Sequence, residues 1–179
     1  MTRFALLRGV NLGKRTVKSA ELKRVFEAMG FDDVAPFLAS GNVAFRAGEE
    51  GEAALCRRIE AGLRDGFGFD VTTFLRTCAE MAEAAAPERI EASPLAGEEG
   101  VTINVLFLAK EVPANLRDAA RGLRSDDDDF LPHGRELYWL RRGRMSESPA
   151  RVPLEKAMAG QGTVRNLNTV RRLVAKFCS

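Results

Sequence analysis

The order of strand-like and helix-like segments in the first 76 residues constrains the fold more than any other feature. Two segments, beginning near Ser19 and near Glu52, repeat apolar side chains at the three- and four-residue spacing of amphipathic helices. Four short apolar segments predict strands, at residues 3–8, 34–39, 43–46 and 71–75. The resulting order, strand-helix-strand-strand-helix-strand, is that of a ferredoxin-like (βαββαβ) unit. Its right-handed crossovers put both helices on one face of an antiparallel sheet, with the first and third strands in the middle.

The second half of the chain is predicted to repeat most of this order. Thr77 and Glu80 form a capping-box pattern that opens a short helix, and Pro87 ends that helix. The segments that follow are a strand at 101–108, a helix from Pro113, strands at 130–131 and 136–141, a short helix at 154–158 and a closing helix at 164–177. We therefore expect an α+β protein with two ferredoxin-like α/β-plait halves, 1–76 and 77–179. The second half is expected to have its last strand missing or replaced and to carry a C-terminal helical extension.

Length and composition indicate a folded, cytoplasmic protein. The chain has 179 residues, of which 45% are hydrophobic and 29% charged, enough to bury a core. No apolar run approaches the ~20 residues that span a bilayer, and no signal peptide is evident, so no membrane association is expected. The three cysteines, Cys56, Cys78 and Cys178, are scattered and odd in number, which predicts free thiols and neither a disulfide framework nor a metal site.

Charge is divided unevenly along the chain. Residues 1–27 carry seven Lys or Arg against two Glu, and residues 131–179 carry ten against three. The middle, residues 28–130, carries ten basic and twenty acidic side chains. If the two ends meet in the fold, they form a basic pole that would attract a phosphorylated small molecule or nucleic acid.

The opening strand leads into a basic loop with two glycines. Gly9 and Gly13 enclose three residues, and Arg15 follows Lys14. A Walker loop needs four residues between its glycines and a Ser or Thr after its lysine, so this segment is not one. Two interpretations remain: the loop binds an anion through its N–H groups and the side chains of Arg8, Lys14 and Arg15, or it is a structural turn that needs flexible glycines.

A second basic segment begins the closing helix. Asn166 is suited to cap that helix, whose first N–H groups have no internal partner. Basic residues at a helix start oppose the helix dipole unless an anion balances them, and Arg165, Arg171 and Arg172 are such residues. The segment is therefore either an anion site or a capped amphipathic helix with a solvated basic face.

Several other patterns admit a structural and a functional interpretation. Tyr138 and Trp139 precede an arginine-rich segment, so they either stack on nucleic-acid bases or belong to the core. The acidic run 126–129 lacks the spacing of a calcium loop and is predicted to be a solvated loop. An enzyme of unknown reaction would have to draw on the following candidates: His133, Ser40, Ser146, Ser148 and Tyr138.

Four motifs resemble a known family. They are FALLRGVNLG at 4–13, SAELKRVFEAMGF at 19–31, ASGNVAF at 39–45 and GTVRNLNTVRRL at 162–173. Together they resemble the uncharacterised bacterial family called domain of unknown function 1697. The resemblance implies a pair of ferredoxin-like α/β plaits and implies no activity. The sequence departs from the family pattern at Lys14, where a glycine is common, and at Leu167, where a tryptophan is common.

The leading hypothesis is a protein that binds a phosphorylated ligand, either a nucleotide or a short nucleic acid, at the basic pole. A small-substrate enzyme and an interaction or dimerisation module remain the alternatives, and cofactor and oligomeric state are left open. The residues expected to bind the ligand are Arg8, Asn11, Lys14, Ser40, Asn42, Thr163, Arg165, Asn166, Asn168 and Thr169.

Overall fold

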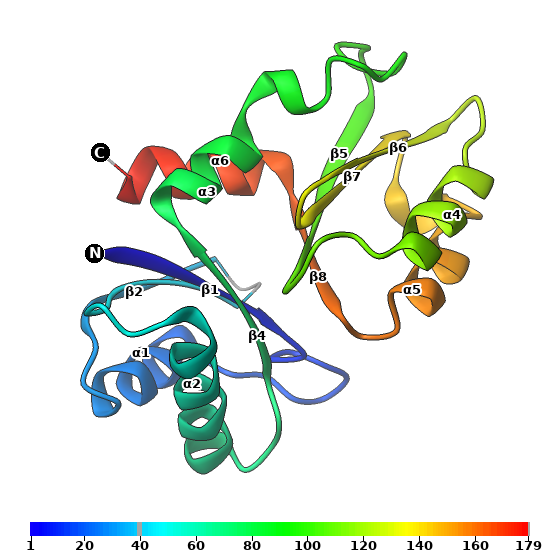
Figure 1. Ribbon diagram of the computed structural model, residues 1–179. Helices are drawn as coiled ribbons and strands as arrows, with labels where there is room; N and C mark the ends of the chain where they lie inside the picture. Colours follow the sequence, from blue (N-terminus) through cyan, green and yellow to red (C-terminus); the bar gives the residue numbers. More distant parts are fainter. Residues whose placement is uncertain (39–40, 179) are drawn as a thin grey trace. The chain divides into compact units, whose positions relative to one another are not determined.

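The computed structural model describes residues 1–38 and 41–178. Within these ranges the chain forms eight strands and six α-helices, and the strands make two four-stranded antiparallel sheets (Figure 1). The chain divides into two compact units: unit 1 is Met1–Met81 with Leu173–Ser179, and unit 2 is Ala82–Arg172. The division falls inside helices α3 (Cys78–Ala85) and α6 (Leu167–Phe177). Every helix in the described ranges is too short or too polar to span a lipid bilayer.

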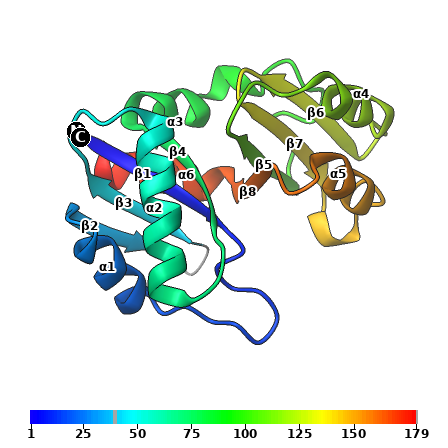
Figure 2. The same cartoon turned by 60° about the horizontal axis from the view of Figure 1, so that its bottom comes forward.

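The sheet of unit 1 has the strand order β2-β3-β1-β4. Its strands are β1 (Thr2–Arg8), β2 (Asp32–Phe37), β3 (Asn42–Arg46) and β4 (Thr72–Thr77), and its helices are α1 (Ser19–Ala28) and α2 (Glu52–Phe67). The predicted apolar stripe of α2 is buried: Leu55, Ile59 and Leu63 belong to one core cluster with Ala5, Leu7 and Val43 of the sheet. Both helices therefore cover the same face of the sheet, as Figure 2 shows.

Local capping fixes where the helices of unit 1 begin and end. The predicted capping box is confirmed, since the Thr77 N–H donates to the Glu80 carboxylate at 2.8 Å and the Glu80 N–H to the Thr77 hydroxyl at 3.2 Å. The N-cap of α1 is Lys18, one residue before the predicted Ser19, and its N–H donates to Glu21 at 3.0 Å. Helix α2 ends at Gly68, whose φ of +79° suits a left-handed cap.

Gly41 combines a positive φ with close side-chain neighbours. Its φ is +72°, and an added Cβ would lie 3.2 Å from Leu7 Cβ and 3.3 Å from Val10 Cγ2. Gly41→Ala is therefore expected to lower the free energy of unfolding by about 1–3 kcal/mol, measured by urea unfolding. Gly48→Ala is the control, because nothing lies within 4 Å of its added Cβ. Equal unfolding midpoints for the two variants would contradict this account.

The sheet of unit 2 has the strand order β6-β7-β5-β8. Its strands are β5 (Val101–Leu108), β6 (Asp128–His133), β7 (Glu136–Arg142) and β8 (Gly162–Asn166). Helices α4 (Ala114–Gly122) and α5 (Arg151–Met158) pack on one face, where Leu116 and Leu154 share a core cluster with Leu106 and Trp139. Trp139 is thus a core residue, as one of the two sequence interpretations predicted, and it is 4% exposed.

The fourth strand, β8, corrects the predicted closing helix. That helix was predicted over 164–177 but begins at Leu167, because the backbone of Gly162–Asn166 pairs with β5. The β5 register places Val164 beside Leu106 and Arg165 beside Val105. Successive residues of β8 therefore point to opposite faces, and unit 2 has the last strand that was predicted to be missing or replaced.

The prediction of a solvated loop holds for Asp126 and Asp127, which are exposed, and is wrong for Asp128 and Asp129. Asp128 is 1% exposed and Asp129 8%, because β6 begins at Asp128. The Asp128 carboxylate accepts hydrogen bonds from Trp139 Nε1 at 2.8 Å, from an Arg141 guanidinium nitrogen at 2.7 Å and from the Ser148 hydroxyl at 3.0 Å. Asp128 therefore forms a buried polar network instead of facing solvent.

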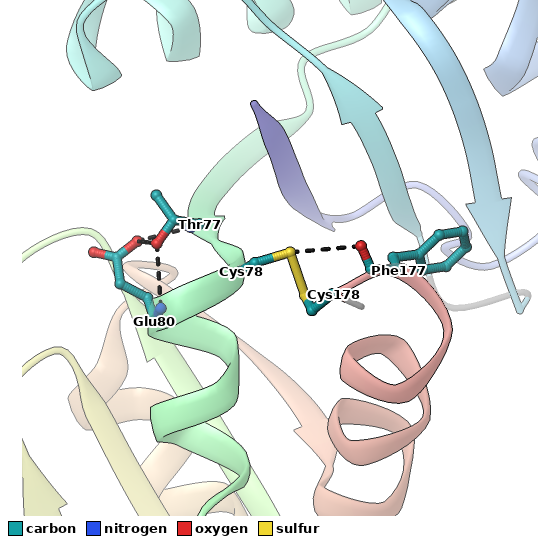
Figure 3. The surroundings of a disulfide bond; sticks show 5 residues. All are labelled: Thr77, Cys78, Glu80, Phe177 and Cys178. Atoms are coloured by element: carbon teal, nitrogen blue, oxygen red, sulfur yellow. Dashed lines mark hydrogen bonds between the residues drawn. A yellow bond between two sulfur atoms is a disulfide. The ribbon is translucent and has the colours of Figure 1, made fainter.

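The predicted free thiols are wrong for two of the three cysteines. Cys78 and Cys178 form a disulfide, with their Cα atoms 5.4 Å apart and 100 residues between them in sequence. Figure 3 shows this bond between the start of α3 and the residue after α6, beside the Thr77–Glu80 capping box. Cys56 is free, and burial with the nearby Glu60 raises the pKa of its thiol to about 12. Cys56 is therefore a protonated, unreactive thiol at neutral pH.

Candidate functional site

A pocket of about 510 Å³ lies in unit 2 on the face of the sheet that α5 covers. Pockets of this size hold small molecules in many proteins. Strands β5, β7 and β8, the 3-10 turn Met145–Glu147 and helix α5 all contribute to it. The lining residues are Thr102, Asn104, Leu106, Trp139, Arg144, Met145, Ser146, Arg151, Leu154, Glu155, Met158, Val164 and Asn166.

The strand register explains why these side chains converge. Thr102, Asn104 and Leu106 alternate along β5, so they point to the same face. Asn104 lies opposite Trp139 of β7 on one side and opposite Asn166 of β8 on the other. The three side chains therefore form one row across the sheet at the floor of the pocket.

The walls of the pocket are mainly apolar. Leu154 and Met158 of α5 face Leu106 of the sheet, and all three belong to the core cluster of unit 2. The indole N–H of Trp139 donates to buried Asp128, which fixes the orientation of the ring. A rigid aromatic ring with aliphatic neighbours favours a flat, apolar portion of a ligand.

Two exposed arginines add positive charge to this pocket. Arg144 lies 3.9 Å from Glu147 and Arg151 lies 3.5 Å from Glu155, both pairs being solvent-exposed contacts within one turn. Such pairs contribute little free energy and break readily. Both guanidinium groups can therefore turn to an anionic ligand group without a large cost.

A smaller polar pocket of about 200 Å³ adjoins the first and shares Thr102 and Asn166 with it. It is lined by Asn168 and Arg171 in the first turns of α6. As the sequence predicted, Asn166 caps this helix, its Oδ1 accepting the Asn168 N–H at 2.9 Å. The positive end of a helix dipole thus lies beside the larger pocket.

The residues predicted to bind a ligand near the N-terminus lie in unit 1. Asn11 Oδ1 accepts the Val17 N–H at 2.8 Å, which closes the opening loop. Asn42 is 1% exposed and its amide donates to the Phe37 carbonyl at 3.0 Å. Arg8 is half-buried at the end of β1, Lys14 is exposed, and Ser40 lies outside the described residues.

Arg15 stabilises the opening loop through two contacts of its side chain. Its guanidinium donates to the Gly9 carbonyl at 2.9 Å and lies 3.7 Å over the ring of Phe69. These contacts favour the interpretation of the loop as a structural turn. They give no support to anion binding by Arg15.

The predicted residues near the C-terminus divide between the two faces of the second sheet. Asn166 and Asn168 lie at the pockets, and Thr169 is half-buried on α6. Thr163 and Arg165 point to the opposite face, where the Arg165 guanidinium donates to the Thr163 hydroxyl at 2.7 Å and to the Val164 carbonyl at 2.8 Å. Burial lowers the pKa of Arg165 to about 10.

The hypothesis of one basic pole joins residues of unit 1 with residues of unit 2, and it stays a prediction. The two sets of residues have different local surroundings. In unit 1, Asn11 and Asn42 hold backbone groups, whereas in unit 2 Asn166 and Asn168 line pockets. Unit 2 therefore provides the better-formed candidate site.

The described residues contain no serine–histidine pair of the kind that activates a nucleophile. His133 is exposed, with its Nδ1 3.0 Å from an Arg89 nitrogen and its ring edge-on to Tyr138. Ser148 donates to Asp128, and the Tyr138 hydroxyl donates to the Ala84 carbonyl at 2.9 Å. Ser146 lines the larger pocket and has no histidine bonded to it in the described part of the chain.

Sequence reasoning missed the pocket residues Asn104 and Arg151, and it considered Arg144 only as part of the arginine-rich segment after Trp139. A signal for the first was present, because an asparagine in the middle of the β-branched strand at 101–108 is unusual. Nothing in the sequence joined it to the two arginines, which are 40 and 47 residues further along the chain. Only the packing of α5 on the sheet brings them together.

Comparisons with known proteins identify a family and a fold. The conserved bacterial protein SP0830 of Streptococcus pneumoniae has a similar solved structure, with a TM-score of 0.77 at 19% sequence identity, and the match covers 99% of this chain and 98% of that one. At this identity the likeness establishes the fold alone. No curated protein sequence matches this chain. A family model matches residues 1–138, and the chain therefore belongs to the family described as "Protein of unknown function (DUF1697)".

Proposed function

We propose that this protein binds a small phosphorylated ligand, a nucleotide, in the larger pocket of unit 2. One observation carries the proposal: a pocket of about 510 Å³ joins apolar walls to two exposed arginines. A nucleotide combines the same two properties, a flat base and a charged phosphate. The base would contact Trp139 and Met158, and the phosphate would contact Arg144 and Arg151.

Arginine is suited to this role for a geometric reason. Its planar guanidinium donates two parallel hydrogen bonds to a phosphate, and it remains charged at every physiological pH. Arg144 precedes α5 and Arg151 begins it, so the short segment between them holds both groups at one end of the helix. Two guanidinium groups in one place favour a phosphate over a carboxylate of lower charge.

The strand orders support a ferredoxin-like arrangement in both units. In unit 1, β1 and β3 are central and β2 and β4 lie at the edges, and in unit 2, β5 and β7 are central and β6 and β8 lie at the edges. This is the order that a split βαβ unit produces. The proposed ligand would then bind on the helix-covered face of the second sheet. We further propose a cytoplasmic location, where nucleotides are available to the protein.

Fluorescence titration tests the proposed function, because Trp139 is the single tryptophan and lines the pocket. Nucleoside monophosphates are expected to change its emission saturably, and nucleosides without phosphate to bind more weakly. Arg151→Ala is expected to weaken nucleotide binding by roughly 10- to 100-fold, because the variant loses hydrogen bonds between the guanidinium and the charged phosphate.

Arg117→Ala is the matched control, since Arg117 is an exposed arginine of α4 outside the pocket lining. It should leave the affinity unchanged. Raising the salt concentration should weaken binding to the unsubstituted protein more than to Arg151→Ala. Absence of saturable binding by all the monophosphates would overturn the proposal, and binding by short oligonucleotides alone would replace it with a nucleic-acid function.

A further inference from the structure

We infer that the pocket selects a base with a lactam edge, a ring carbonyl next to a ring N–H, and that Asn104 and Asn166 recognise that edge. Hypoxanthine, guanine and uracil have such an edge, whereas adenine does not. The inference rests on the proposed function and adds the class of base to it.

Asn104 is the first observation. It is 8% exposed, at the centre of β5, and it lines the pocket. Its side-chain amide forms no hydrogen bond with any residue in the ranges 1–38 and 41–178. The amide is not fully buried, and it opens into the pocket that Asn104 lines. Asn104 therefore has a donor and an acceptor ready for a ligand in this pocket.

Asn166 is the second observation. Its Oδ1 accepts the backbone N–H of Asn168, and only an oxygen can do so. This contact fixes which way the Asn166 amide points, leaving its NH₂ group as a donor with no hydrogen bond to a described residue. Asn104 and Asn166 are register partners in the β5–β8 ladder, so their side chains are neighbours on one face.

Together the two amides present two donors and one acceptor. A lactam carbonyl has two lone pairs and accepts an N–H from each asparagine, and the adjacent ring N–H donates to Asn104 Oδ1. The corresponding edge of adenine offers a ring nitrogen with one lone pair, so one of the two asparagine donors stays unpaired. Trp139, on the other side of Asn104, provides the aromatic surface beside which the base would lie.

Inosine monophosphate (IMP) and adenosine monophosphate (AMP) are a matched pair for the test, because their bases differ only along this edge. Titration of Trp139 fluorescence is expected to give an affinity for IMP roughly tenfold or more above that for AMP. Asn104→Leu, which keeps the side-chain size, is expected to bring the ratio of the two affinities close to one. Arg117→Ala, which lies outside the pocket lining, should keep the preference for IMP.

The outcomes separate this inference from the proposed function. Saturable binding of IMP and AMP with equal affinity would overturn the lactam preference and leave nucleotide binding intact. Failure of IMP, AMP and all the other monophosphates to bind would overturn the proposed function itself. A preference for IMP that survives in Asn104→Leu would remove Asn104 from the recognition. If Asn104→Leu does not fold, uridine monophosphate and cytidine monophosphate provide a second matched pair. Their affinities are then measured with the unsubstituted protein, and equal affinities would overturn the inference.

Discussion

Replacing Asp128 with alanine is expected to lower the free energy of unfolding of unit 2 by about 3–5 kcal/mol, the usual cost of breaking a buried ion pair on one side. The Asp128 carboxylate is 1% exposed and accepts hydrogen bonds from Trp139, Arg141 and Ser148. Without it, the Arg141 side chain, which is 11% exposed, keeps its charge without a carboxylate partner. Urea unfolding followed by Trp139 fluorescence measures the change.

Asp127→Ala is the matched control for this prediction. Asp127 is the neighbouring aspartate, but it is exposed and its ion pair with Arg142 is a surface contact of 3.3 Å. Its replacement should cost less than about 1 kcal/mol. Adding Arg141→Leu to Asp128→Ala should recover part of the loss, because no unpaired charge then remains buried. Equal stability of Asp128→Ala and Asp127→Ala would show that the network does not stabilise unit 2.

The location of Asp128 illustrates which information was missing from the sequence. Four adjacent aspartates are typical of solvated loops, and composition alone supported that prediction. The partners that bury one of them lie 11, 13 and 20 residues further along the chain. Trp139 and Arg141 are two positions apart on one strand, so both point to the face on which Asp128 lies. That pairing depends on the register of β6 with β7, which no local pattern encodes.

The segments with strong periodicity were predicted closely. The stripe of α2 and the strand at 101–108 were both found, because each contains enough apolar side chains at one spacing to identify its type. The boundary between β8 and α6 was missed for the opposite reason. Val164 and Leu167 are three residues apart and fit a helical stripe, yet Thr163 to Asn166 form a strand because β5 offers them a ladder of hydrogen bonds.

The candidate site could be predicted in part. Asn166 and Asn168 were selected from the sequence, and both line pockets in the structure. Their partner Asn104 and the arginines of the larger pocket depend on the tertiary packing of unit 2, so local sequence patterns did not identify them. Asn11 and Asn42 were chosen for polarity, and the structure shows each bonded to a backbone group within its own unit. Polar side chains in turns often bond to the backbone, and sequence does not separate that use from ligand binding.

Reduction of the Cys78–Cys178 disulfide is expected to lower the free energy of unfolding of unit 1 by about 2–4 kcal/mol. The two cysteines are 100 residues apart, so the bond removes much of the freedom of the unfolded chain. Phe177, next to Cys178, also packs edge-on against Phe4 and Phe37, with ring centroids 6.2 and 6.0 Å apart. Urea unfolding with and without dithiothreitol, followed by circular dichroism, measures the difference.

Cys56 makes this experiment easy to interpret. Its pKa is raised to about 12, so at pH 8 its thiol is almost entirely protonated and exchanges slowly with the bridge. The Cys56→Ala variant should therefore show the same loss of stability on reduction as the unsubstituted protein. A Cys78→Ser variant, which has no bridge, should unfold at the same urea concentration with and without reductant. Alkylation of the free thiols shows whether the bond has been reduced. If it is reduced and the unfolding midpoint of the unsubstituted protein stays constant, the disulfide contributes nothing to stability. The aromatic contacts of Phe177 would then suffice to hold the end of α6 in unit 1.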